Sequence, residues 1–241
     1  MKNILILTFV FFSISSYAQG VQIIENISFR NEKVEKFEYI DKNLDLNNLE
    51  KVIVLRGFSV NSRDNTLADL FNVFWKMSNA VGANSYFIDE VEQISDTIYV
   101  QITAYYLDDK TLENNFNLYP QNMVYVFGDL NLKKGKVRRI KINGQRIELP
   151  PLKHIEIQNE IGLRTTVSIG GFAGTRVDIT GREGRLPAYF SFSGFSVGPA
   201  LNMMGPMMQP GQVGISFNTG KIHPVRMNFG QFLINILTKK E

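Results

Sequence analysis

Apolar and polar residues alternate along this chain with two periods, and each period predicts a different kind of element. Residues 51–60 form an apolar run rich in β-branched side chains, which predicts a buried strand. The next apolar residues recur at the three-four spacing of one helical face: Leu67, Leu70, Phe71, Phe74, Met77, Ser78 and Val81. Strands are then predicted at 85–88, running on towards Val91, and at 97–107, with 90–96 as the turn. The predicted unit is strand, helix, strand, strand.

Both ends of the predicted helix carry sequence signals. Thr66 and Asp69 have the spacing of a capping box, in which each residue satisfies a free backbone N–H of the first turn. Gly82 stands where a left-handed residue commonly ends a helix. The helix should therefore occupy the residues between these two signals.

After Pro120 glycines and turn signals recur about every eight to twelve residues, and the pattern becomes that of an all-β protein. Asn143-Gly144 is the two-residue turn that best fits the twist of a β-hairpin. The apolar stretch 228–237 fits a terminal strand or a short helix equally well. The candidate strands are 123–128, 136–142, 145–149, 154–159, 165–170, 175–180, 188–192 and 211–218.

These elements predict an α+β protein with two domains. Residues 19–118 would form a small β-α-β-β domain, and residues 119–241 an all-β, sandwich-like domain. The boundary is expected between Asn114 and Gln121, where the texture of the sequence changes.

Residues 1–18 have the order of a secretory signal peptide. Lys2 precedes an apolar run from Ile4 to Phe12, and small residues at Ser16 and Ala18 predict cleavage before Gln19. The apolar run is shorter than the roughly twenty residues that a spanning helix needs, so we expect no transmembrane span after cleavage. The Tyr-Ala-Gln ending resembles signal peptides of Bacteroidetes. We therefore predict export to the periplasm or cell surface of a Gram-negative bacterium.

Composition narrows the chemistry further. The chain has no cysteine, which excludes disulfides, thiol nucleophiles and thiolate metal sites. The 26 lysines and arginines barely outnumber the 23 aspartates and glutamates, so no strong basic field is present. The basic residues between Lys133 and Lys141 alternate with apolar ones, which is typical of a solvated strand face. We predict no nucleic-acid partner for an exported chain of this kind.

Two segments resemble known families. The helix that ends in Ala80-Val81-Gly82-Ala83-Asn84 and runs into two strands resembles small bacterial envelope domains of the RcsF and YbjQ type, over residues 51–107. This resemblance implies a non-enzymatic role, although the cysteines of the RcsF type are missing. Residues 123–170, with VYVFGD, INGQRIELPP and HIEI, resemble the β-sandwich modules called DUF2846-like or PEGA-like.

One motif suggests an enzyme. Gly194-Phe195-Ser196-Val197-Gly198 fits the G-x-S-x-G nucleophile elbow, with His223 as the only histidine after Ser196. In that fold an acid follows the serine and precedes the histidine, but the first acid after Ser196 is Glu241. A serine hydrolase is therefore kept as an alternative, and no catalytic residue is assigned.

Metal and cofactor sites are not predicted either. A zinc site would need His154, His223 and distant carboxylates, and the acidic groups at 89–92 and 108–109 sit where turn formers are common. Four methionines surround one Gly-Pro turn at Met203, Met204, Met207 and Met208. Thioethers bind copper(I), which makes a copper site a second alternative, but adaptable apolar packing is their commoner use.

The function predicted is an exported, non-enzymatic cell-envelope protein that binds a protein partner or a surface glycan. Exposed aromatic and methionine side chains are typical of interaction sites. The predicted contact surface is Met203, Met204, Met207, Met208, Tyr189, Phe190, Phe192 and Phe195. The alternative interpretation is that these side chains belong to the core.

Overall fold

The computed structural model describes residues 20–31, 34–60, 65–130, 135–170, 174–192, 216–217 and 222–240. Its strands form three sheets of five strands each, accompanied by three α-helices and one short 3-10 helix, η1 (Leu46–Asn48). The presence of both helices and strands confirms the α+β class predicted from the sequence. The predicted signal peptide, Phe195, Ser196 and the four methionines of 203–208 lie outside the described residues.

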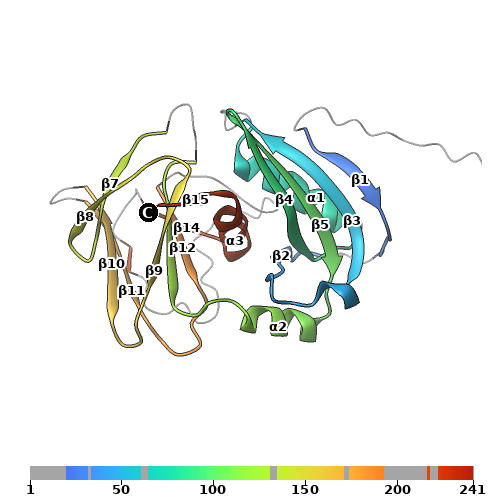
Figure 1. Ribbon diagram of the computed structural model, residues 1–241. Helices are drawn as coiled ribbons and strands as arrows, with labels where there is room; N and C mark the ends of the chain where they lie inside the picture. Colours follow the sequence, from blue (N-terminus) through green and yellow to red (C-terminus); the bar gives the residue numbers. More distant parts are fainter. Residues whose placement is uncertain are drawn as a thin grey trace, which may run out of the picture.

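The first sheet has the order β1-β3-β5-β4-β2 and contains the predicted strand-helix-strand-strand unit. Its strands are β1 (Gln22–Asn26), β2 (Glu38–Tyr39), β3 (Glu50–Ser59), β4 (Ser85–Ile94) and β5 (Thr97–Tyr106). The connecting helix α1 (Leu67–Ala80) packs its apolar side, including Leu70, Phe71 and Phe74, against this sheet (Figure 1).

The ends of α1 are as the sequence predicts. Thr66 Oγ1 accepts from the Asp69 backbone N–H at 3.1 Å, and Asp69 accepts from the Thr66 N–H at 2.9 Å. Gly82 has φ +85°, and a Cβ there would lie 2.7 Å from the Arg30 carbonyl oxygen. Only glycine combines this conformation with so close a neighbour.

Two predictions about the first sheet need correction. β4 does not turn at Glu90: it continues to Ile94, and the turn is confined to Ser95 and Asp96. The charged residues of this stretch are solvent-exposed on a long hairpin. Their polar character therefore reflects exposed strand positions and does not mark a loop. The segment after β5 also holds an unpredicted helix, α2 (Asp109–Asn117).

The other two sheets face each other across a second apolar core. One has the order β13-β11-β10-β7-β8, and the other β14-β12-β6-β9-β15. Asn143 and Gly144 both have positive φ, which confirms the predicted hairpin turn. The strands are β6 (Met123–Phe127), β7 (Arg138–Ile142), β8 (Gln145–Leu149), β9 (Lys153–Gln158), β10 (Arg164–Ile169), β11 (Thr175–Thr180), β12 (Ala188–Ser191), β13 (Ser216–Phe217), β14 (His223–Val225) and β15 (Thr238–Lys239).

The second part of the chain is not all β, because residues 227–236 form helix α3 (Met227–Ile236). Phe229, Phe232 and Leu233 are fully buried on one helical face. They belong to the same apolar cluster as Phe71 and Phe74 of α1, and this cluster continues to Tyr125 and Tyr189. Figure 1 shows α3 between the first sheet and the sheet that contains β12. Within the described residues, no helix is long and apolar enough to cross a membrane.

Candidate functional site

Three of the four aromatic residues of the predicted contact surface lie in the described part of the chain, and all three are buried. Tyr189, Phe190 and Phe192 are exposed to 3%, 1% and 6%. β12 lies between β6 and β14, and the Tyr189 ring stacks on Tyr125 with centroids 5.2 Å apart. These three residues are core residues, as the alternative interpretation had it. Phe190 and Phe192 belong to the core between the two sheets, and Tyr189, on the opposite face of β12, is covered by α3 at Gly230.

The two histidines lie in different strands of one sheet, β14 and β9, and β12 and β6 separate them. His223 lies in β14 opposite Ser191. His154 is 2% exposed, and its Nε2 lies 3.3 Å from Glu156 Oε1. Burial lowers the pKa of His154, so the neutral ring is favoured despite the nearby carboxylate. Within the described residues, no group of three histidine or carboxylate side chains could hold a metal ion.

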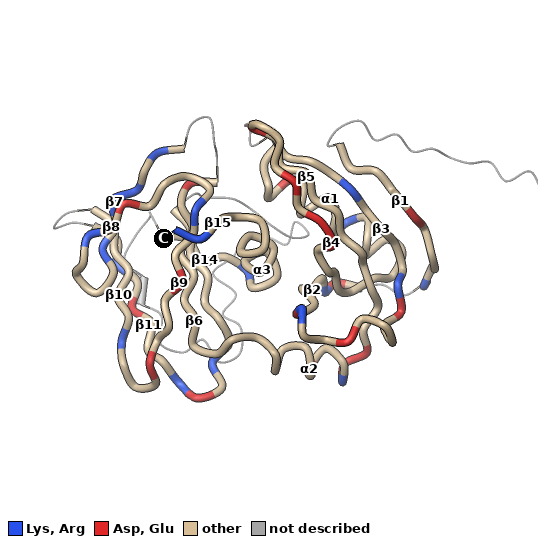
Figure 2. Tube along the Cα trace, viewed as in Figure 1, with Lys and Arg blue, Asp and Glu red and all other residues tan. Residues whose placement is uncertain are grey.

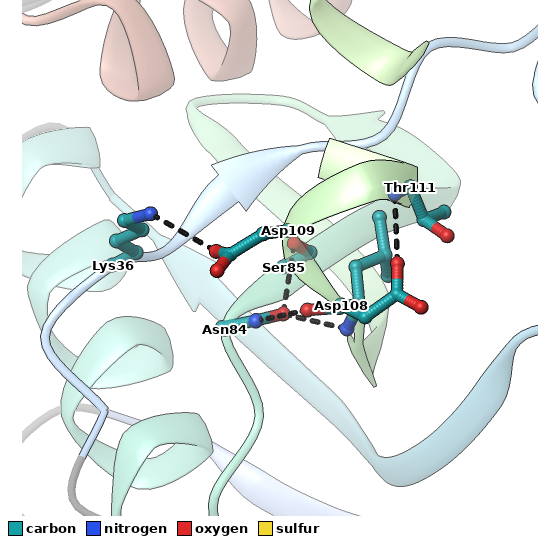
Figure 3. Close-up of polar contacts among 7 residues, drawn as sticks. Lys36, Asn84, Ser85, Asp108, Asp109 and Thr111 are labelled. Carbon is teal, nitrogen blue, oxygen red and sulfur yellow. Dashed lines mark hydrogen bonds and ion pairs between the residues drawn. The ribbon is translucent and has the colours of Figure 1, made fainter. Parts of the chain in front are cut away.

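The acidic residues singled out from the sequence have structural roles. Asp89 accepts from Thr103 Oγ1 at 2.8 Å, and burial raises the pKa of its carboxyl. Asp108 caps α2 by accepting from the Thr111 N–H at 2.7 Å, and the hydrogen bonds from Thr111 lower its pKa. Asp109 lies 3.7 Å from Lys36 Nζ (Figure 3).

The Gly-Ala-Asn segment is also explained by its contacts. Asn84 is buried beside the first residues after β5, where its side chain accepts from the Leu107 N–H at 2.8 Å and donates to the Leu107 carbonyl at 2.6 Å. Ser85 Oγ donates to the same amide oxygen at 3.1 Å (Figure 3). Asn84 therefore fastens the start of β4 to the end of β5, which is a folding role.

A different surface has the features of a binding site. It lies on the side of the sandwich where β8 is the last strand of one sheet and β9 is followed only by the two-residue strand β15 in the other. Neighbouring residues of a strand direct their backbone groups to opposite sides. Asn143 N donates to Thr166 O, so in β7 the groups of Ile140 and Ile142 are directed to β8. The partners of these two residues in β8 are Ile147 and Gln145, which leaves the N–H and C=O groups of Arg146 and Glu148 on the outer edge.

β9 has a partly open edge on the same side. Gly128 N donates to Lys153 O and Asn159 N donates to Asn122 O, so residues 153, 155, 157 and 159 are directed to β6 and its flanks. The backbone N–H and C=O groups of His154, Glu156 and Gln158 therefore lie on the outer edge of β9. β15 covers the beginning of this edge, and the Lys240 N–H donates to the His154 carbonyl at 2.8 Å.

A groove of about 520 Å³ runs along the β8 edge, within the size range of ligand sites. Ile147 and Ile155 supply its apolar surface, and both are only partly buried at the rim of the sandwich core. The lining is completed by Gln145, Arg146, Glu148 and Lys240.

The charges around this groove are unbalanced towards the positive. Glu148 already pairs with Arg139 at 3.1 Å, and Glu156 with Lys239 at 2.5 Å. Burial alone would raise the pKa of Glu156, but hydrogen bonds from Lys239 and His154 hold it below its ordinary value. Among the described residues, no ion pair involves Lys141, Arg146 or Lys240. Figure 2 shows the positions of Lys and Arg along β7, β8 and β15.

Protein-family models, curated proteins and solved structures contain no match to this chain. The resemblances to RcsF- and YbjQ-type domains and to DUF2846-like or PEGA-like modules therefore stay predictions. The groove itself was missed by sequence reasoning. The alternation in 145–149 predicted a strand, but its position at a sheet margin depends on pairings with residues far along the chain.

Proposed function

We propose that this chain is an exported, non-enzymatic protein of the cell envelope that binds a protein partner or a surface glycan. The groove beside β8 supports this proposal, because it combines partly exposed isoleucines with cations that have no acidic partner among the described residues. Apolar surface with a polar, charged rim is typical of binding sites.

The location can be tested by expressing the full precursor in a Gram-negative host. We expect the protein in the periplasmic or cell-surface fraction, with Gln19 as its N-terminal residue. Recovery of the uncleaved chain in the cytoplasm would contradict export.

The binding role can be tested with the double variant Arg146→Glu/Lys240→Glu, which reverses both unpaired cations of the groove lining. Wild-type and variant proteins would be incubated with native envelope extract, and the recovered material measured with and without prior protease treatment of the extract. We expect recovery to fall at least about tenfold, equivalent to about 1.4 kcal/mol of binding free energy. If protease treatment of the extract abolishes recovery, the partner is a protein; if recovery is unchanged, the partner is a glycan.

The matched control is Lys42→Glu/Lys76→Glu, which changes the net charge equally at two exposed positions of the first part. It should recover as much material as the wild type. Equal recovery by wild-type and groove variants would overturn the proposed site.

A further inference from the structure

We infer that the partner of the groove is a protein segment in extended conformation, which adds to the β8 edge as a further strand and alternates apolar with acidic side chains. This inference rests on the proposed binding function and names its ligand. It is carried by three features: the unpaired backbone groups of β8, the apolar surface beside β8, and the cations Arg146 of β8 and Lys141 of β7 on the outer face of the sheet.

The backbone of β8 supplies the first feature. The outward N–H and C=O groups belong to Arg146 and Glu148, by the alternation fixed in the β7 and β8 pairing. No hydrogen bond to these backbone groups is found among the described residues. A row of such groups is a template for another strand, and peptide-binding domains use sheet edges in this way.

The side chains decide what that strand must carry. Residues beside one another on adjacent strands share a face of the sheet. A residue added next to Ile147 would face the sandwich core, where Ile147 and Ile155 form the apolar lining of the groove. Its neighbours on either side would face outward, next to Arg146 and Glu148. An apolar residue suits the first position.

The charges on β7 and β8 indicate which residues the partner strand should place on its outward face. Lys141 and Arg146 are directly opposite each other in the β7 and β8 register, and like charges in such a pair repel. Glu148 cannot neutralise both, because it already pairs with Arg139. An acidic residue beside Arg146 would relieve this repulsion, so the partner strand should alternate apolar and acidic residues.

The test uses a fluorescein-labelled peptide of eight residues that alternates valine and glutamate, with binding to the mature chain measured by fluorescence anisotropy. Two control peptides isolate the causes: one alternates valine and lysine, and one carries an N-methyl group on every backbone amide, so that it has no N–H to donate to a strand edge. We expect the valine-glutamate peptide to bind at least about tenfold more tightly than either control.

A matched pair of protein variants isolates the edge of β8. Glu148→Pro removes the outward N–H, while Glu148→Ala makes the same change of charge and keeps that N–H. Both variants make the groove more positive. Charge attraction alone would therefore tighten binding in both, whereas strand addition requires at least about tenfold weaker binding by Glu148→Pro than by Glu148→Ala.

Equal binding by the two variants, or by the three peptides, would overturn strand addition. Absence of binding to the wild-type chain would overturn it as well. The proposed function can survive this failure: if envelope material is still recovered through Arg146 and Lys240 while the peptide does not bind, the groove has a ligand of another kind.

Discussion

Glu38 is a carboxyl group in the middle of a tyrosine-rich contact between the two parts of the chain. It lies in β2 opposite Ser85, and burial raises its pKa to about 7, although Lys36 and Arg226 oppose the rise. Its charge in turn adds to the effect of burial in raising the pKa of the Tyr86 and Tyr119 hydroxyls. An acid in this position favours its neutral form, so the stability of the protein should depend on its proton.

The sign of this dependence follows from the two states. The unfolded chain loses the Glu38 proton near pH 4.5 and the folded chain near pH 7, so the stabilisation by Glu38 is complete below pH 4.5 and is lost as the pH rises to about 7. We expect Glu38→Gln to gain stability relative to wild type over this range. The full shift corresponds to on the order of 3 kcal/mol, and partial exposure of Glu38 should make the measured gain smaller.

Urea unfolding followed by the fluorescence of Trp75, the single tryptophan, measures this difference at each pH. His154 acts in the opposite direction, since burial lowers its pKa and costs stability as the pH falls below about 6.5. Comparing variant with wild type at each pH cancels that contribution. Glu113→Gln, at an exposed position of α2, is the control, and a profile identical to that of Glu38→Gln would refute the role of Glu38.

The elements differ in how far local sequence determined them. α1 was predictable because its caps, its apolar face and Gly82 are all local signals. α2 was missed because DKTLENNFN has few apolar residues, although Asp108 carries a visible N-cap signal. α3 was ambiguous because Gly230 weakens its helical propensity. The free edge of β8 could not be predicted, since Arg146 and Glu148 are outward only because of what pairs with β7.

Gly230 lies where α3 packs closely against Tyr189 of β12. A Cβ at this position would lie 2.4 Å from ring atoms of Tyr189. Gly230→Ala should therefore destabilise the protein. Overpacking costs about 1 to 3 kcal/mol of folding free energy, which exceeds the gain of up to about 1 kcal/mol from the higher helical propensity of alanine. Urea unfolding should show a lower midpoint.

Lys76→Ala in α1 is the control, because it replaces a solvent-exposed helical residue. Its midpoint should stay near that of the wild type. If Gly230→Ala were as stable as the wild type, the close contact between α3 and Tyr189 would be refuted.

At the scale of the whole molecule, α3 completes the core of the first sheet. The ring of Phe71 lies 5.2 Å from that of Phe229 and 5.0 Å from that of Phe232, and Tyr86 Oη donates to the Asn228 carbonyl at 2.6 Å. Asn228 also donates to the Phe37 carbonyl at 3.0 Å. The predicted division at residue 118 cuts through these contacts, so the two domains expected from the sequence share one apolar cluster.

A fragment of residues 20–118 tests this dependence. Without α3, the rings of Phe71 and Tyr86 lose part of their cover, and we expect the fragment to bind the dye ANS and to unfold without a sharp transition. A chain of residues 20–241 should bind little dye and unfold cooperatively. A fragment with dispersed amide resonances and the urea midpoint of the full chain would show that residues 20–118 fold independently.

The hydrogen bond between Tyr86 and Asn228 also has a consequence for the order and rate of folding. Its two residues are 142 positions apart, so the contact cannot form until all of the intervening chain and Asn228 itself have been synthesised. Contacts this distant require closure of long loops, which slows folding relative to proteins built from neighbouring residues. If the chain is exported, as proposed, while it is being synthesised, the contact can close only after the segment that contains Asn228 has also been exported.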